Sequence, residues 1–207
     1  MPEEVTVVPM REEHIEGLVD VYLQAFHDRP SGKMGRAYAR QFLRWFMNYD
    51  HGLAFAAVEG RDVLGFGVGA VLGYQKQMNR AMFWTVFWSL LPRPWLWANK
   101  DVLHNVTVRI KVALGLYKKP ASAPDIHYPA PTMSYVGAGV SDKARGKRVG
   151  KKIYTAFSTT TENSGKYKAI RGTVHETNAP VNKILSGLGW KEMATDENGY
   201  VEWAKIF

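Results

Sequence analysis

The sequence predicts an α/β protein with a mixed β-sheet. Three observations support this class. Runs rich in β-branched residues alternate with stretches whose apolar residues recur at helical spacing. Two pairs of neighbouring strand-like runs are separated by residues typical of hairpin turns. Hydrophobic residues make up 46% of the 207-residue chain and charged residues only 22%, a composition that can bury a core. At this length we expect residues 1–207 to form a single domain.

The first half of the chain opens with a strand, two helices and a hairpin. The strand and the two amphipathic helices are expected at residues 5–8, 15–26 and about 35–47. The runs 53–58 and 63–72 favour strands, and Glu59-Gly60-Arg61-Asp62 between them is typical of a turn. These two strands should therefore pair antiparallel.

Residues 73–128, here called the 73–128 segment, differ in composition from the rest and are interpreted as an insertion. The segment contains four of the seven tryptophans: Trp84, Trp88, Trp95 and Trp97. Its basic residues outnumber Asp101 and Asp125: Lys76, Arg80, Arg93, Lys100, Arg109, Lys111, Lys118 and Lys119. We expect helices at about 81–91 and 102–116, because so long a stretch without structure is uncommon in a compact domain.

The second half of the chain continues the alternation of strands and helices. Strands are expected at 133–140 and 169–174, and helices from Val149 onward and from 179 or 180 to about 186. The runs 190–193 and 200–207 flank a polar, glycine-containing stretch and predict a closing hairpin.

A basic, glycine-containing loop joins the strand at 133–140 to the helix that begins at Val149. It runs from Ser141 to Lys152 and includes Arg145-Gly146-Lys147-Arg148 and Gly150-Lys151. A strand, such a loop and a helix N-terminus together direct backbone N–H groups and positive charge at an anion. A phosphate site is the favoured interpretation, and a solvated basic turn is the alternative.

This element order and two motifs resemble the GNAT superfamily of acyl-CoA N-acyltransferases. The first motif is the loop of the form Q/R-x-x-G-x-G/A, which wraps the CoA pyrophosphate and here reads Arg145-Gly146-Lys147-Arg148-Val149-Gly150. Arg148 stands where the family has its central glycine, which the loop tolerates if the φ angle of Arg148 is negative. The resemblance implies a central, mostly antiparallel, twisted sheet flanked by helices. It also implies a set of residues that bind acetyl-CoA: Ala138, Val140, Arg145, Gly146, Lys147, Arg148, Val149, Gly150, Lys151 and Asn178.

The second motif resembles the family's N-x-x-A-x-x-L-Y-x-x-x-G-F helix. Asn178 opens it, and Gly189-Trp190 closes it at the expected separation. Leu185 occupies the position of the tyrosine that, in many members, protonates the departing CoA thiolate. Leucine cannot donate a proton, so Ser186, another hydroxyl or water takes this role, or no dedicated acid is needed. A catalytically inactive relative is a further interpretation.

The mechanism implied by the resemblance is attack of an amine on the thioester after a base removes the amine proton, with a strand amide polarising the carbonyl. No motif fixes the base. His175 and Glu176 follow a strand that should line the cleft and are equal candidates, although either is also explained as a solvated loop residue. Tyr135, on the preceding strand, is a further candidate for acid or base. The six histidines show no metal-ligand spacing, so no metal is expected.

Composition limits the partners and the compartment. The net charge of +8 indicates an anionic partner, but nucleic acid is disfavoured because CoA already accounts for the densest cationic cluster and no nucleic-acid motif is present. The absence of cysteine excludes disulfides and thiolate sites and is consistent with the cytoplasm. A homodimer is the default expectation for such a domain.

Two functional hypotheses follow. The first is an acetyl-CoA-dependent N-acetyltransferase that acts on a primary amine of a small molecule, with an amino sugar as one suitable acceptor. The second is a catalytically degenerate GNAT-like protein whose 73–128 segment docks on an anionic membrane or a partner protein. Packing onto the domain is the favoured explanation of the aromatic residues of this segment.

Overall fold

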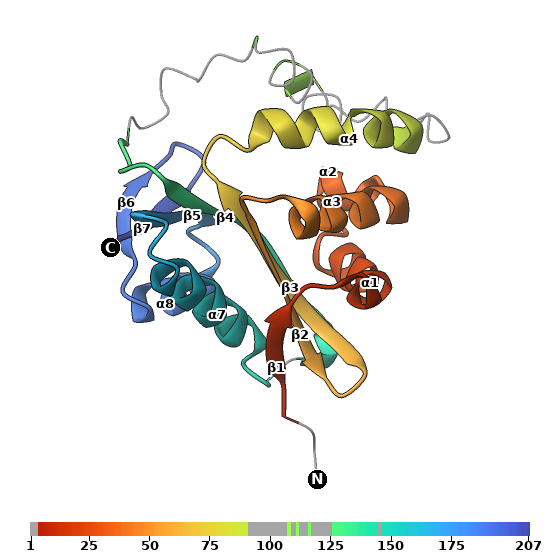
Figure 1. Ribbon diagram of the computed structural model, residues 1–207, viewed down its shortest axis with the longest axis horizontal. Helices are drawn as coiled ribbons and strands as arrows, with labels where there is room; N and C mark the ends of the chain where they lie inside the picture. Colours follow the sequence, from red (N-terminus) through yellow and green to blue (C-terminus); the bar gives the residue numbers. More distant parts are fainter. Residues whose placement is uncertain (1–3, 91–106, 109–110, 112–115, 117–125, 145) are drawn as a thin grey trace.

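The sheet is the centre of the molecule in the computed structural model, which describes residues 4–90, 107–108, 111, 116, 126–144 and 146–207. Seven strands form one sheet in the order β1-β2-β3-β4-β5-β7-β6 (Figure 1). Their bounds are Thr6–Pro9 (β1), Gly52–Glu59 (β2), Asp62–Val71 (β3), Thr132–Val140 (β4), Ala169–His175 (β5), Lys191–Thr195 (β6) and Tyr200–Ile206 (β7). Only β4 and β5 pair in parallel; the other neighbours pair antiparallel. The predicted α/β class with a mostly antiparallel mixed sheet is confirmed.

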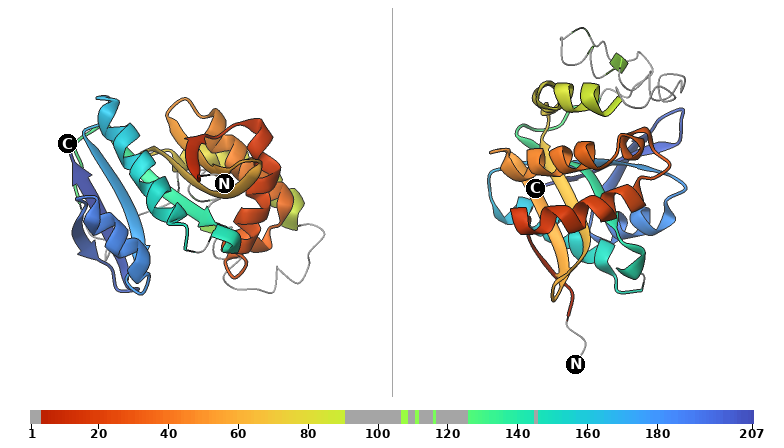
Figure 2. Two further views of the ribbon diagram at one scale, coloured as in Figure 1. Left: turned by 90° about the horizontal axis from the view of Figure 1, so that it is seen from below. Right: turned by 90° about the vertical axis from the view of Figure 1, so that its right-hand side faces the viewer.

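Helices cover both faces of the sheet (Figure 2). One face carries α1 (Ile15–Ala25), α2 (Pro30–Lys33) and α3 (Arg36–Asn48), with α4 (Gln75–Leu90) packed against α3. The opposite face carries α7 (Val149–Asn163) and α8 (Ala179–Gly187). Two short 3-10 helices, η1 (Glu12–His14) and η2 (Asp142–Ala144), precede α1 and α7.

The α1–α3 face has a continuous aromatic and aliphatic core. Tyr38 and Phe46 of α3 are almost fully buried there. Their neighbour Trp45 stacks on Tyr49 with ring centroids 4.5 Å apart. Because these rings recur at helical spacing, one stripe of α3 is enough to anchor the helix on β2 and β3.

Close approach of α7 to β3 depends on three alternating glycines, Gly65, Gly67 and Gly69. Successive residues of a strand face opposite sides, so all three present their missing side chains to α7. A Cβ atom at Gly67 would collide with Ile153, and one at Gly69 would collide with Phe157. Both Ile153 and Phe157 are fully buried. The helix that follows the predicted phosphate loop is therefore seated directly on the sheet.

Most predicted elements are found, with differences at their ends. The hairpin pairing Glu59 with Asp62 and the closing β6–β7 hairpin are confirmed. The helix expected at 81–91 instead starts at Gln75, because the polar residues of its first turns carry no apolar periodicity but do not interrupt a helix. Helix α2 was not predicted. The helix expected at 102–116 falls mostly outside the described residues, as does Arg145.

Strands β4 and β5 are paired over only part of their length. Their parallel pairing runs from Thr132 with Ala169 to Tyr135 with Gly172 and goes no further. At the same point β4 has a bulge: Val68 pairs with Gly137 and Gly69 with Tyr135, which leaves Val136 as the extra residue. The carboxyl-terminal halves of β4 and β5 therefore separate, and a space opens between them.

Candidate active site

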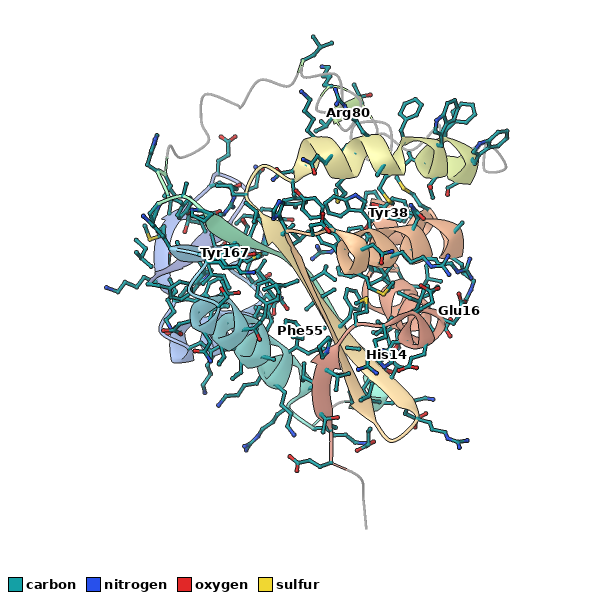
Figure 3. All side chains as sticks on the ribbon, in the orientation of Figure 1. His14, Glu16, Tyr38, Phe55, Arg80 and Tyr167 are labelled. Carbon is teal, nitrogen blue, oxygen red and sulfur yellow. The ribbon has the colours of Figure 1, made fainter. Side chains whose placement is uncertain are left out.

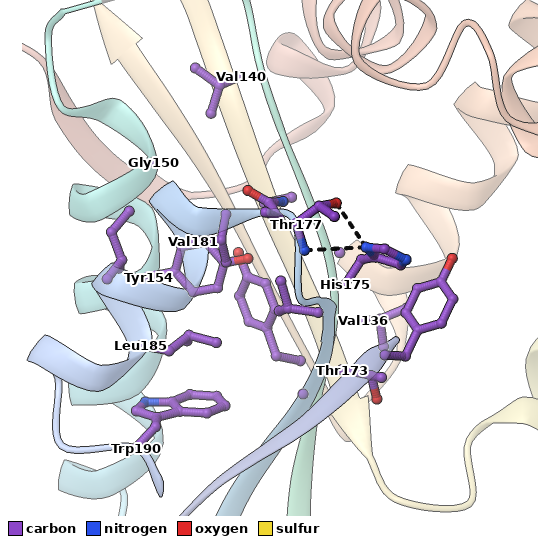
Figure 4. Close-up of a pocket in the computed structure, with 18 of the residues that line it drawn as sticks. Val136, Val140, Gly150, Tyr154, Thr173, His175, Thr177, Val181, Leu185 and Trp190 are labelled. Carbon is purple, nitrogen blue, oxygen red and sulfur yellow. Dashed lines mark hydrogen bonds between the residues drawn. The ribbon is translucent and has the colours of Figure 1, made fainter. Parts of the chain in front are cut away.

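A cavity of about 630 Å³ occupies the space where β4 and β5 separate (Figure 4). Its walls come from the second half of β4, the end of β5, the start of α7 and the inner face of α8. Phe26 and Arg29, from the connection between α1 and α2, complete the rim. Segments far apart in the sequence meet here, as expected for a ligand site at diverging parallel strands.

One end of the cavity is bordered by the N-terminus of α7. Gly150 lines the cavity, and a Cβ atom placed on it would have Val140 Cγ2 at 3.9 Å as its one neighbour, so the backbone is open to the cavity. No side chain caps the first turn of α7. Unpaired N–H groups and the positive end of the helix dipole therefore point toward this end, which suits a phosphate group.

Arg148 corrects one expectation from the sequence. It has φ 56° and ψ 25°, the left-handed region, whereas the sequence interpretation required a negative φ. The loop reverses direction immediately before α7, and a left-handed residue makes that reversal; glycine does so without strain, which accounts for the glycine of the motif. Arginine here adopts a backbone conformation that is uncommon outside glycine. Gly146, with φ 79°, is the second left-handed residue of the loop.

The remaining predicted CoA-binding residues divide into two groups. Ala138, Val140, Gly150 and Asn178 line the cavity. Val149 is buried in the core beneath the loop, and Lys147 pairs with Glu59 on β2. Gly146, Arg148 and Lys151 are exposed around the start of α7, so the structure brings them to the loop but not to the cavity wall. The assignment of this set to acetyl-CoA stays a prediction.

The floor of the cavity is aromatic and largely apolar. The rings of Tyr135 and Tyr154 stack with centroids 4.5 Å apart, and Leu185 and Trp190 lie beside them. Burial raises the pKa of the Tyr154 hydroxyl to about 12 and that of Tyr135 well above its ordinary value. Both phenols are therefore neutral at physiological pH. The Trp190 side chain is held in place by its Nε1–H, which donates a hydrogen bond to Ser158 Oγ at 3.2 Å.

His175 lies at the opposite end of the cavity, at the carboxyl end of β5 (Figure 4). The backbone N–H of Thr177 donates to His175 Nδ1 at 3.3 Å, and the Thr177 hydroxyl lies 2.8 Å from the same nitrogen. Because Nδ1 accepts a hydrogen bond, this contact assigns the proton of the neutral ring to Nε2. The ring meets Tyr200 edge-on at 5.0 Å. In this arrangement His175 can donate a hydrogen bond through Nε2. It is less suited to act as a base, because the lone pair of Nδ1 already accepts a hydrogen bond from Thr177.

Glu176 is not brought to the cavity wall. It is exposed, its backbone N–H donates to the carbonyl of Gly199 at 2.8 Å, and its carboxylate lies beside the β6–β7 turn. The backbone carbonyls of His175 and Glu176 both accept hydrogen bonds from Asn182 Nδ2, at 3.3 and 3.0 Å. Asn182 thus holds the turn after β5 in place, and the role of Glu176 as a base stays a prediction.

Several cavity residues were missed by sequence reasoning. Phe26 and Arg29 reach the site only because the α1–α2 connection folds over β4, and the sequence carries no signal for that. Tyr154 had a usable signal: it stands four residues after Gly150, so both lie on one face of a helix.

No protein-family model matches the sequence, and no curated protein matches it. Solved structures do match it over nearly the whole chain. A GCN5-related N-acetyltransferase from Kribbella flavida is 13% identical with a TM-score of 0.60, and the match covers 98% of each chain. This chain therefore has the GNAT fold. A protein from Corynebacterium glutamicum described as histone acetyltransferase HPA2 and related acetyltransferase is 18% identical, with a TM-score of 0.54 over 99% of this chain and 94% of that chain. PH1933 from Pyrococcus horikoshii is likewise 18% identical, with a TM-score of 0.57 over 99% of both chains. At these identities the likeness establishes the GNAT fold and leaves the substrate open.

Two further observations concern the described residues only. They contain no group of three or more histidine, cysteine, aspartate or glutamate side chains that could hold a metal ion. None of the helices that they form has the length and apolar content to span a bilayer.

Proposed function

We propose that the protein is an N-acetyltransferase that transfers the acetyl group of acetyl-CoA to a primary amine of a small molecule. One observation carries the proposal: the cavity between the separating strands β4 and β5 meets the uncapped N-terminus of α7 at Gly150. A phosphate-binding helix end and a cavity with an aromatic floor, in one continuous space, suit a molecule that has a pyrophosphate and a long uncharged arm.

Different residues along the cavity would bind different parts of acetyl-CoA. Gly146, Arg148, Gly150 and Lys151 would hold the pyrophosphate through backbone N–H groups and positive charge. Val136 is the extra residue of the β4 bulge and lines the cavity, so backbone groups at this point are available to polarise a thioester carbonyl. Acetyl-CoA, when bound, supplies the thioester whose acetyl group passes to the amine.

The rim formed by the α1–α2 connection suits an acceptor that carries negative charge. Among the described residues that line the cavity, Arg29 is the only lysine or arginine, and none carries a carboxylate. The Arg29 guanidinium lies 5.4 Å from the ring centroid of Phe26, which fixes its direction. We propose an amino sugar with an attached phosphate as one acceptor of this kind, since sugars stack on aromatic rings and phosphates pair with arginine.

The test is calorimetric titration of the protein with acetyl-CoA, alone and after Gly150→Glu. Submillimolar binding by the unchanged protein is expected, and the glutamate should weaken it at least about tenfold, because a carboxylate beside the helix end repels the pyrophosphate. Gly187→Glu is the matched control: it adds the same charge to an exposed position at the far end of α8, where a Cβ atom meets nothing within 4 Å. The absence of binding by the folded protein would contradict the proposal.

A second candidate function is favoured by the outer face of α4. Phe83, Trp84, Phe87 and Trp88 are exposed there by 42%, 64%, 41% and 62%. Lys76 and Arg80 precede Trp84 and Trp88 at intervals of four residues, so a basic and an aromatic half share one stripe that points away from the sheet, as Arg80 does in Figure 3. Such a stripe suits an anionic membrane surface. Binding to anionic vesicles that falls steeply with salt, in a protein that does not bind acetyl-CoA, would favour this candidate.

Three further statements stay predictions from the sequence: a single domain that includes the 73–128 segment, a cytoplasmic location and a homodimer.

A further inference from the structure

The cavity has walls on both faces of the sheet. Gly172 of β5 faces the α7–α8 side, where a Cβ atom placed on it would meet Trp190 at 3.5 Å. Thr173 is the next residue, so it faces the opposite side, and both residues line the cavity. Gly150 borders the cavity on the α7 side and Arg29 borders it on the side of the α1–α2 connection. Two ligands that enter from opposite faces can therefore meet between β4 and β5.

The last pair of the two strands marks where the gap between them begins. Tyr135 of β4 pairs with Gly172 of β5, and the pairing ends there. Val136 and Thr173 are the next residues of the two strands, so they flank the start of the gap (Figure 4). Paired strands lie about 4.8 Å apart. A group held by Thr173 is therefore next to a thioester carbonyl held at the backbone of Val136.

The hydroxyl of Thr173 has a defined polarity. It donates to Glu202 Oε2 at 2.9 Å, because a carboxylate can only accept, and it accepts from Arg171 Nη2 at 3.0 Å. These are its hydrogen bonds within the described part of the chain. Since a hydroxyl has one proton and two lone pairs, one lone pair remains to accept from a further donor. The Thr173 side chain is exposed at the cavity wall, so a ligand can reach it.

Glu202 on the neighbouring strand β7 fixes this polarity. Its Oε2 also accepts from Arg171 Nη2 at 2.6 Å, and its Oε1 accepts from the Tyr128 hydroxyl at 2.8 Å. Burial and the hydrogen bond to Glu202 raise the pKa of Tyr128, so its hydroxyl stays protonated and donates. The carboxylate is held on both oxygens and keeps the proton of Thr173 directed at itself.

A hydroxyl that is left with only a lone pair suits a neutral amine. A primary amine has two N–H donors and a lone pair that can attack a carbonyl carbon. Arg29, on the same side of the cavity, can only donate, so it suits an anionic group elsewhere on the acceptor and repels a protonated amine. Thr173 and Arg29 thus select different parts of one acceptor.

We propose that Thr173 accepts a hydrogen bond from the acceptor amine and directs its lone pair at the thioester carbonyl, and that Glu202 is a positioning residue that orients the Thr173 hydroxyl. This inference rests on the proposed function. In the transfer, the amine nitrogen bonds to the carbonyl carbon, the carbon–sulfur bond breaks with its electron pair remaining on sulfur, and the proton released by nitrogen passes to water. Thr173 keeps its own proton and contributes orientation.

The experiment uses hydroxylamine as the amine, because it is small, uncharged at neutral pH and carries N–H donors. Its reaction with acetyl-CoA gives CoA and acetohydroxamic acid, which are measured as free thiol and as the coloured ferric complex. We expect the unchanged protein to accelerate this reaction. Thr173→Val, which is isosteric, should lower kcat about 10- to 100-fold and leave the KM for acetyl-CoA unchanged. Thr173→Ser keeps the hydroxyl and should retain most of the activity.

Thr195→Val is the matched control. The Thr195 hydroxyl also donates to a glutamate, Glu192 Oε1 at 3.1 Å, but Thr195 is not among the described residues that line the cavity. This variant should leave the rate unchanged.

Glu202→Gln separates positioning from a structural role. It should lower kcat about 3- to 10-fold in the unchanged protein and have no further effect once Thr173 is valine. A merely structural role would lower kcat by the same factor in both backgrounds, and that result would overturn the role of Glu202.

The two proposals fail separately. If acetyl-CoA does not bind to the folded protein, the proposed function is wrong. If acetyl-CoA binds but the protein does not accelerate its reaction with hydroxylamine, or if Thr173→Val reacts as fast as the unchanged protein, the role of Thr173 is overturned while the acetyl-CoA site stands.

Discussion

The two faces of the sheet differ in how fully side chains fill the space between the sheet and its helices. On the α1–α3 face one cluster of buried residues runs without interruption from Met10 through α3 to α4. On the α7–α8 face the buried residues form two clusters, and the cavity opens beside the larger one, where an enclosed tyrosine hydroxyl also lacks a partner. The first face supplies stability, and the second gives up part of it to leave a space that a ligand can fill. The following predictions test this difference.

The largest effect is expected on the complete face. Phe46 is 1% exposed and contacts Phe42, Trp45 and Tyr74, so Phe46→Ala would leave a void that its rigid aromatic neighbours cannot close. We expect the free energy of unfolding to fall by about 3–5 kcal/mol. Urea denaturation followed by tryptophan fluorescence measures it. A loss below about 1 kcal/mol would show that this face is no better packed than the other.

A smaller effect of the opposite sign is expected on the cavity face. Tyr135→Phe removes a buried hydroxyl that has no partner, so the free energy of unfolding should stay constant or rise by up to about 1 kcal/mol. Ser158→Ala is the contrasting control, because it leaves the buried Trp190 Nε1–H without its acceptor and should lower that free energy by about 1–3 kcal/mol. If Tyr135→Phe were as destabilising as Ser158→Ala, the hydroxyl of Tyr135 would have a partner after all.

The smallest effect concerns the solvent side of the complete face. Arg40 donates hydrogen bonds to Glu16 at 2.6 and 2.9 Å, tying α3 to α1 on the side shown by Glu16 in Figure 3. These bonds lower the pKa of Glu16 from 4.5 to about 2. A depressed carboxyl pKa stabilises the fold above the unfolded value and loses that contribution as the pH falls through the folded value.

The difference in melting temperature between the unchanged protein and Glu16→Gln should therefore shrink as the pH is lowered from about 5 to about 2, and also at high salt. The pair is exposed, so the difference should be the least of the three. A difference that is independent of pH would mean that the charge of Glu16 does not join the helices.

The order of most elements was predictable from the sequence because most of them carry their own periodicity; the short helix α2 does not, and it was missed. The cavity was not predictable, because it depends on where β4 and β5 stop pairing, and no local pattern encodes that register. His175 and Glu176 show the same limit. Strand β5 ends at His175, which lines the cavity, whereas Glu176 begins the turn that follows and lies beside Gly199. Arg148 shows that a motif position can keep its backbone conformation after losing the residue that favours it.

The three alternating glycines of β3 fix the height at which α7 rests on the sheet. The same helix carries the anion-binding end at Gly150 and, one turn later, Tyr154 on the cavity floor. A methyl group at Gly67 or Gly69 would lift the helix and with it both parts together, since Ile153 and Phe157 leave no room beneath. The absence of side chains at Gly65, Gly67 and Gly69 thus sets the depth of the cavity. It also fixes the positions of Gly150 and Tyr154 relative to the sheet.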